Sequence, residues 1–153
     1  MNKKEYVLNQ LESWRNALYA EIVNEYSEFA DSGMDYLDSL YRAHLNARTY
    51  ISTAKLSGQD LQHQIDIRED NLERMTEYLL EKTDAKNTKK IMGMYNRLAQ
   101  ADEYAYIIKN GSYFKQKYTI HCVYNMIEYT KITKRCDNIK KQSDNDKEDN
   151  LTK

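Results

Sequence analysis

The chain has 153 residues, of which 31% are charged, and its net charge is −1. This length can bury one core, but no apolar run reaches the roughly 18 to 20 residues of a membrane span. The first ten residues lack the apolar core of a signal peptide and two cysteines make no disulfide framework, so we expect a soluble, cytoplasmic protein.

Long helices are expected throughout the chain, because it contains no proline and only four glycines. Apolar residues recur at helical spacing almost everywhere, as in the first segment with Val7, Leu11, Trp14 and Leu18. We expect five helices, over residues of about 3–30, 34–56, 60–82, 88–109 and 112–140.

Residues able to end or begin helices mark the connections. Asp31 or Ser32 can cap the second helix, and Gly58 stands where a left-handed C-terminal cap of that helix belongs. Gly111 and Ser112 pair a C-cap glycine with an N-cap serine before the fifth helix.

Together these signals predict an all-α fold of about five long helices, arranged as an antiparallel helical bundle or a helical array. We expect one helical domain over residues 1–142. The polar, aperiodic residues 143–153 are predicted to be a disordered tail.

The near-zero net charge hides a segregation along the chain. Residues 1–85 carry a net charge of −7, residues 86–142 carry +8, and residues 143–153 carry −2. Such a split can mean two surfaces for two partners, or acidic helices that pack beside basic ones and cancel their charge. The sequence leaves both interpretations open.

The aromatic and basic segment over residues 111–136 raises the question of its own role. At 100° per residue, most of its large side chains fall on one broad face: Tyr113, Phe114, Tyr118, His121, Tyr124, Tyr129, Ile132, Cys136 and, just beyond, Ile139. A helix apolar over so much of its circumference is expected to be buried by several neighbours or by another subunit, so a homo-oligomer is plausible.

No metal, cofactor or catalytic site is predicted. His121 and Cys136 share a face but lie roughly 22 Å apart along a helix, far beyond any shared metal. Asp60 and His63 form a single i, i+3 pair, whereas di-metal bundles use two such pairs with further carboxylates. Phosphate-binding, dinucleotide-binding and hydrolase motifs are missing, so we expect a protein that is not an enzyme.

The leading hypothesis is a non-enzymatic protein-interaction module. Carboxylates follow one another before the first cation of the second helix, and we expect them to form an acidic surface for a basic, nucleic-acid-handling protein partner: Glu21, Glu25, Glu28, Asp31, Asp35 and Asp38. Phage-encoded inhibitors of host enzymes, including anti-CRISPR proteins, use acidic surfaces in this way as a class, so a phage or mobile-element inhibitor or adaptor is a candidate.

The alternative is a nucleic-acid-binding accessory protein that uses the basic, tyrosine-rich residues 86–142. Cationic grooves with stacked aromatic rings hold single strands without sequence preference. The candidate contacts are Lys89, Lys90, Arg97, Lys117, Tyr124, Lys131 and Arg135.

Overall fold

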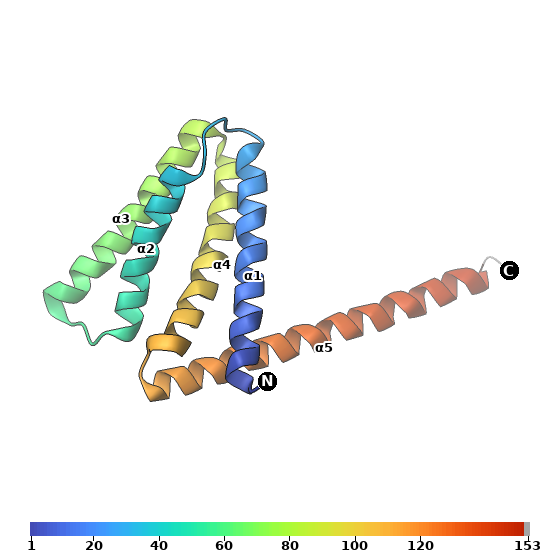
Figure 1. Ribbon diagram of the computed structural model, residues 1–153. Coiled ribbons are helices and arrows are strands. Elements are labelled where there is room, and N and C mark those ends of the chain that lie inside the picture. The colour runs from blue at the N-terminus through green and yellow to red at the C-terminus, as the bar shows by residue number, and fades with distance from the viewer. Residues whose placement is uncertain (152–153) are drawn as a thin grey trace.

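The structure, a computed structural model, describes the backbone of residues 1–151 and the side chains of residues 1–142 (Figure 1). These residues form five α-helices and no strand: α1 (Lys3–Ser27), α2 (Asp35–Thr53), α3 (Gly58–Lys82), α4 (Ala85–Asn110) and α5 (Tyr113–Leu151). The predicted all-α class is confirmed. The predicted disordered tail, residues 143–153, lies outside the fully described residues.

Polar side chains begin three of these helices. Asn2 accepts a hydrogen bond from the Glu5 N–H at 2.8 Å before α1, and Asp84 accepts one from the Asn87 N–H at 2.8 Å before α4. The Ser112 hydroxyl accepts from the backbone N–H three residues later at 3.3 Å, as the sequence predicts. Each bond satisfies a backbone donor that the first helical turn leaves without a partner.

The predicted cap of α2 is wrong. Met34 precedes that helix and makes no side-chain capping bond. The Ser32 hydroxyl is instead hydrogen-bonded to the hydroxyls of Tyr26 and Tyr78, at 2.9 and 3.3 Å. These contacts between distant parts of the chain use the hydroxyl that the sequence predicts as the helix cap. Gly58 does have a left-handed φ of 55°, but it is the first residue of α3 rather than the cap of α2.

Helices α1 to α4 form the predicted antiparallel bundle. α1 packs against α4, α2 packs against α3, and α2 also contacts α4, which is therefore the central helix (Figure 1). One cluster of buried side chains joins all four helices and includes Ile22, Leu37, Leu79 and Leu98. A second cluster joins the other end of α1 and α4 to α5.

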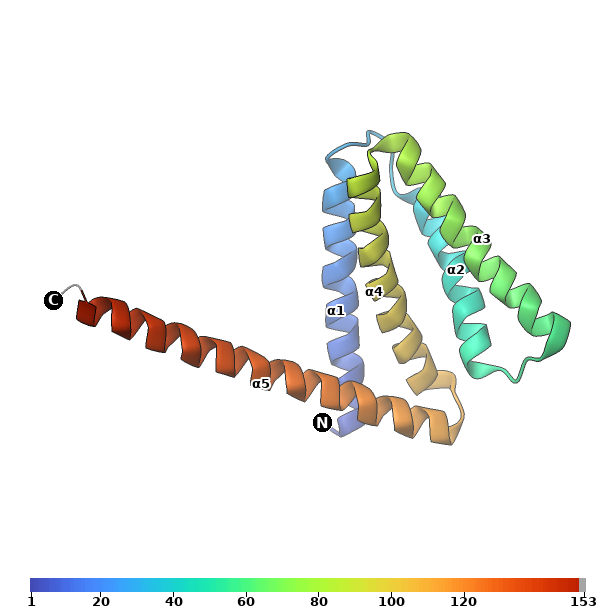
Figure 2. The ribbon, with the colours of Figure 1, turned by 180° about the vertical axis from the view of Figure 1, so that it is seen from behind.

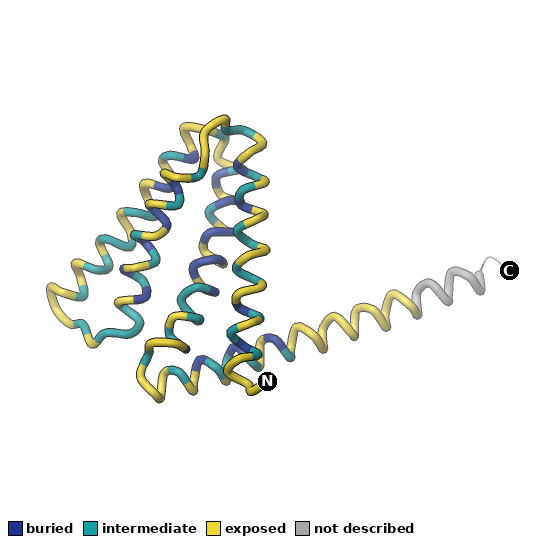
Figure 3. The backbone as a smooth tube through the Cα atoms, in the orientation of Figure 1, coloured by how far each residue is buried: buried dark blue, intermediate teal, exposed yellow. Residues whose placement is uncertain are grey.

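Helix α5 crosses the end of the bundle and then projects away from it (Figures 1 and 2). Among the described side chains of this helix, only Thr119, Val123 and Ile127 are buried, and every residue from 129 to 142 is exposed (Figure 3). The expectation that neighbouring helices of the same chain bury this helix over most of its circumference is therefore wrong. The turn at Gly111 and Ser112 sends α5 across α1 and α4, so only its first turns meet the bundle.

None of the described helices has an apolar stretch long enough to cross a lipid bilayer.

The glycine at the α4–α5 turn is required by close approach, because a Cβ atom at Gly111 would lie 2.7 Å from the carbonyl oxygen of Ile107. The turn that directs α5 away from the bundle is thus tightly packed against the last turn of α4.

Candidate interaction surfaces

Exposed carboxylates gather where α1 ends and α2 begins. Glu28, Asp31 and Asp35 are all exposed around this connection, and Glu21 is exposed about two turns before it on α1. Among the described residues, none of these four carboxylates has an ion-pair partner. We call Glu21, Glu28, Asp31 and Asp35 the acidic end of the bundle.

The other two predicted acidic residues are engaged inside the chain. Glu25 forms an ion pair with Lys90 of α4 at 2.8 Å. Asp38 accepts a hydrogen bond from the Tyr19 hydroxyl at 2.8 Å, and burial, together with this bond, raises the pKa of Tyr19. These two carboxylates therefore tie helices together rather than face solvent freely.

The last turns of α1 contradict a local electrostatic preference. A helix C-terminus carries a partial negative charge and is stabilised by cations, each by about 0.3–1 kcal/mol. α1 has no basic residue in its last turn, and Glu28 stands at its C-cap. Such departures from local preference are expected at functional or strained sites.

Direct ion pairs within the fold do not cancel the charge split of the sequence. Of the six ion pairs among the described residues, only Glu25–Lys90 joins an acidic residue of the first 85 positions to a cation of residues 86–142. Two others, Arg15–Asp102 and Arg48–Glu103, pair a cation of the mostly acidic residues 1–85 with a carboxylate of the mostly basic residues 86–142. Apart from Glu25–Lys90, ion pairs among the described residues do not join the excess acidic residues to the excess basic ones.

The predicted basic residues do not form one surface. Lys89 and Lys90 lie in the second turn of α4, beside the acidic end, whereas Lys117 and Arg135 belong to α5, the helix that crosses the opposite end of the bundle (Figure 1). About 28 residues of helix and turn separate Lys89 from Lys117, and roughly 33 Å of α4 separates the two ends. Arg97 lies between them near the middle of α4.

Several of these groups are already in contact with other side chains. The half-buried ring of Tyr124 packs edge-on against Tyr6, with centroids 6.1 Å apart, and the Lys3 ammonium lies 4.2 Å from its centroid. The Lys131 ammonium is hydrogen-bonded to the Tyr6 hydroxyl, which raises the pKa of Lys131. The ring of Tyr124 is therefore not free to stack on a base.

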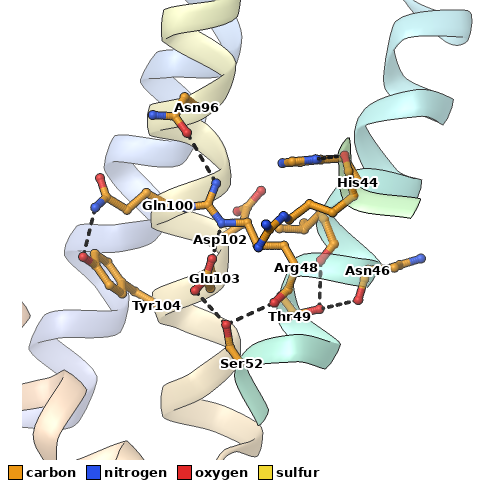
Figure 4. Close-up of polar contacts among 12 residues, drawn as sticks. His44, Asn46, Arg48, Thr49, Ser52, Asn96, Gln100, Asp102, Glu103 and Tyr104 are labelled. Carbon is orange, nitrogen blue, oxygen red and sulfur yellow. Dashed lines mark hydrogen bonds and ion pairs between the residues drawn. The ribbon is translucent and has the colours of Figure 1, made fainter. Parts of the chain in front are cut away.

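A polar cluster that the sequence did not reveal lies between α1, α2 and α4 (Figure 4). Asp102 accepts hydrogen bonds from Arg15 of α1 at 3.0 Å and from the Tyr41 hydroxyl of α2 at 2.7 Å. Its neighbour Glu103 binds Arg48 of α2, and its second oxygen accepts from the hydroxyl of Ser52 at 2.8 Å (Figure 4). The sequence signal that could have revealed this cluster is the pair Asp102 and Glu103, two carboxylates within the apolar stripe of α4, whose other charged residues are basic.

This cluster holds helices together. Each of the four oxygens of the two carboxylates accepts one hydrogen bond from a side chain of α1 or α2. Burial and the bond to Asp102 raise the pKa of Tyr41 well above its usual value, which keeps its hydroxyl protonated as a donor. Among the described residues no group of three or more His, Cys, Asp or Glu side chains is placed to hold a metal ion.

The surface also contains an apolar groove of about 350 Å³ between α1 and α4. Trp14 and Leu18 of α1 line it, with Tyr104 of α4, and Met126 of α5 contributes at the corner where α5 crosses. Glu21 and Arg97 also line the groove. The groove therefore shares Glu21 with the acidic end.

The two stacked tyrosines Tyr41 and Tyr95 allow a matched test of the polar cluster. Their ring centroids lie 5.3 Å apart, but only Tyr41 has a partner, whereas the Tyr95 hydroxyl is buried without a hydrogen bond. We expect Tyr41→Phe to lower the free energy of unfolding by about 1–3 kcal/mol, because it leaves a carboxylate oxygen without its donor. Tyr95→Phe removes an unsatisfied hydroxyl and should leave stability unchanged or increase it. Urea denaturation measures both, and equal losses would contradict the assignment.

The buried His44 should make stability depend on pH. Its Nδ1 donates to the Arg68 carbonyl at 2.9 Å. Burial lowers the pKa of His44 and outweighs the opposing effect of this hydrogen bond, and the positive charges of Arg48 and Arg68 lower the pKa further. Protonation therefore favours the unfolded chain, and stability that is present above about pH 6.5 is lost as the pH falls below it. We expect His44→Asn to reduce the difference in free energy of unfolding between about pH 7.5 and about pH 5.5. His63→Asn, at an exposed position, should leave that difference as in the wild type.

Comparison of the chain with known protein families, with curated proteins and with solved structures finds no match in any of the three. The surfaces described above, with their charges, exposure and internal contacts, are therefore the basis on which a function can be proposed.

Proposed function

We propose that this protein is a non-enzymatic protein-interaction module that presents its acidic end to a basic protein partner. The observation that carries the proposal is the group of exposed carboxylates around the α1–α2 connection, which has no ion-pair partner among the described residues. Carboxylates held in this way attract a basic surface, accelerate its association and suppress binding to acidic competitors.

The position of Glu28 supports this proposal further. A carboxylate at the C-cap of α1 lies at the negative end of the helix dipole, where a lysine would be more stable. An arrangement that costs local stability and is exposed to solvent is expected where binding needs it. The neighbouring Asp31 and Asp35 extend the same negative surface over the connection and into the first turn of α2.

The partner class follows from the same chemistry. Enzymes that handle nucleic acids carry cationic channels for phosphates, and closely spaced carboxylates on rigid helices can occupy such channels. We propose an inhibitor or adaptor of such an enzyme, in the manner of phage and mobile-element inhibitors. The basic α5 crosses the opposite end of the bundle (Figure 1), and none of the four carboxylates of the acidic end forms an ion pair among the described residues.

Charge reversal at the acidic end tests the proposal. The full chain, immobilised, should retain basic proteins from a lysate of its native host at low salt, with retention falling as salt rises. We expect the triple variant Glu28→Lys, Asp31→Lys, Asp35→Lys to lose these proteins, since like charges across an interface are strongly unfavourable.

Glu73→Lys is the control for the single variant Glu28→Lys, because it makes the same charge change at an exposed position of α3 that forms no ion pair among the described contacts. It should retain the same proteins as the wild type. Glu28→Lys alone should raise the free energy of unfolding by about 0.3–1 kcal/mol while weakening retention, because it favours the helix dipole and opposes the partner. Equal retention by all variants would refute the proposal.

A second candidate function, binding of single-stranded nucleic acid by α5, is favoured by one specific observation. Tyr113, Phe114 and Tyr118 are 72%, 78% and 64% exposed at the start of α5, and the Lys117 ammonium lies 4.8 Å from the Tyr113 ring centroid. Exposed rings beside lysines can stack on bases and hold a phosphate backbone.

Fluorescence anisotropy with labelled single-stranded DNA and RNA at low salt tests this candidate. We expect binding, if it uses α5, to weaken in the variant Lys117→Glu, Arg135→Glu and to fall steeply with salt. Lys89→Glu, at the far end of α4, is the control and should bind as the wild type does. No binding at low salt removes this candidate and leaves the protein-interaction proposal untouched.

A further inference from the structure

The exposed apolar side chains of the protein are concentrated on α5. Seven of the twelve large hydrophobic side chains that are exposed in the described part of the chain belong to this helix. Tyr129, Ile132 and Ile139 are 72%, 55% and 70% exposed on the part that projects beyond the bundle. Single exposed hydrophobic residues need no explanation, but a row of them on one projecting helix indicates an interface.

Four of these side chains, Tyr118, Tyr129, Ile132 and Ile139, lie on a heptad repeat along α5. Successive seam positions are Tyr118, Cys122, Asn125, Tyr129, Ile132 and Cys136, with Ile139 completing the run. The alternating spacing of four and three residues is the spacing of a two-stranded coiled coil. At 100° per residue, the buried residues Val123 and Ile127 point about 150° and 170° away from the centre of this seam, and Thr119 about 110° away. The seam from Asn125 onward therefore faces away from the chain's own bundle, whereas Cys122 is half-buried beside it.

We propose that α5 pairs with α5 of a second copy of this chain, as an antiparallel coiled coil along residues 122–139. In the register that this seam allows, Tyr129 packs against Ile132 of the second copy. Cys122 then faces Ile139 of the second copy, and Asn125 faces Cys136 of the second copy. Each layer occurs twice, because a two-fold axis relates the copies and makes the interface self-complementary.

Charge complementarity selects the antiparallel orientation. Glu128 and Arg135 lie one heptad apart on the same edge of the seam. In an antiparallel pair, Glu128 of each copy lies beside Arg135 of the other copy. A parallel pair would instead place Arg135 beside Lys140 of the second copy, a repulsive contact. Glu128 also lies 3.7 Å from Lys131 within its own helix, a distance that leaves its carboxylate free to take a shorter contact.

The single polar seam residue restricts the register further. The Asn125 amide lies 3.2 Å from Nε2 of His121, at the edge of the seam, so its polar group is satisfied within its own helix. A lone asparagine in an apolar seam destabilises alternative registers that would bury it against large hydrophobic side chains. In the proposed register it meets the small side chain of a cysteine.

The mass of the full chain in solution, measured by light scattering over a range of concentrations, tests the pairing. We expect twice the monomer mass for the wild type, and the monomer mass for the variant Ile132→Asp, Ile139→Asp. The control variant Thr130→Asp, Asn138→Asp changes exposed residues of the same projecting segment away from the seam and should remain a dimer. Since none of these positions touches the bundle, loss of the dimer cannot be attributed to misfolding; a monomeric wild type overturns the proposal.

A charge exchange tests the orientation. Glu128→Arg alone and Arg135→Glu alone should each weaken the dimer roughly two- to tenfold, since each places like charges side by side twice. The double variant Glu128→Arg, Arg135→Glu restores opposite charges across an antiparallel pair and should recover wild-type affinity. Failure of the double variant to recover it overturns the antiparallel pairing.

Cysteine cross-linking tests the register. One protein keeps only Cys136, by Cys122→Ser; the other has its only thiol at position 125, by N125C with Cys122→Ser and Cys136→Ser. On mild oxidation, a mixture should form cross-linked dimers, whereas each protein alone should not, because its thiols would lie about 16 Å apart along the helices. Cross-linking of each protein alone indicates a parallel pair, and a dimer without any cross-link indicates another register; either result overturns the proposal.

Discussion

Two adjacent carboxylates on α4 hold the bundle in its arrangement. Neighbouring residues of a helix point about 100° apart, so Asp102 reaches Arg15 of α1 while Glu103 reaches Arg48 of α2. One turn of the central helix therefore fixes the positions of helices on two of its sides. The acidic end depends on this arrangement, because its carboxylates belong to α1 and α2 and can form one surface only while both helices stay in register with α4.

The helices could be predicted from the sequence because apolar spacing and the absence of proline act locally. The acidic end was foreseeable too, since a short connection must keep the end of α1 near the start of α2. The polar cluster could not be predicted. The sequence does not distinguish an exposed carboxylate from one that is hydrogen-bonded to a residue of another helix, such as Arg15 or Arg48. Likewise, the spacing of Tyr129 and Ile132 indicates an apolar face but not what covers this face. In the structure the chain's own bundle leaves both side chains exposed.

The fold resolves the question that the charge split poses. Packing could have placed the acidic first half against the basic second half, yet among the described residues only Glu25 and Lys90 form such an ion pair. The halves are joined by apolar contacts in the two core clusters and by the ion pairs Arg15–Asp102 and Arg48–Glu103. Exposed carboxylates consequently gather at one end of the bundle, with Lys89 and Lys90 beside them, and a basic helix crosses the other end (Figure 1).

Helix α5 passes without interruption from its buried turns around Val123 and Ile127 to the exposed turns beyond them. A continuous helix resists bending, so force or torque applied to the projecting part is carried back to the core as it would be along a lever. Helix α5 contacts the bundle where it crosses α1 and α4, next to Met126 and the apolar groove. Met126 therefore belongs both to the helix that projects from the bundle and to the wall of the groove.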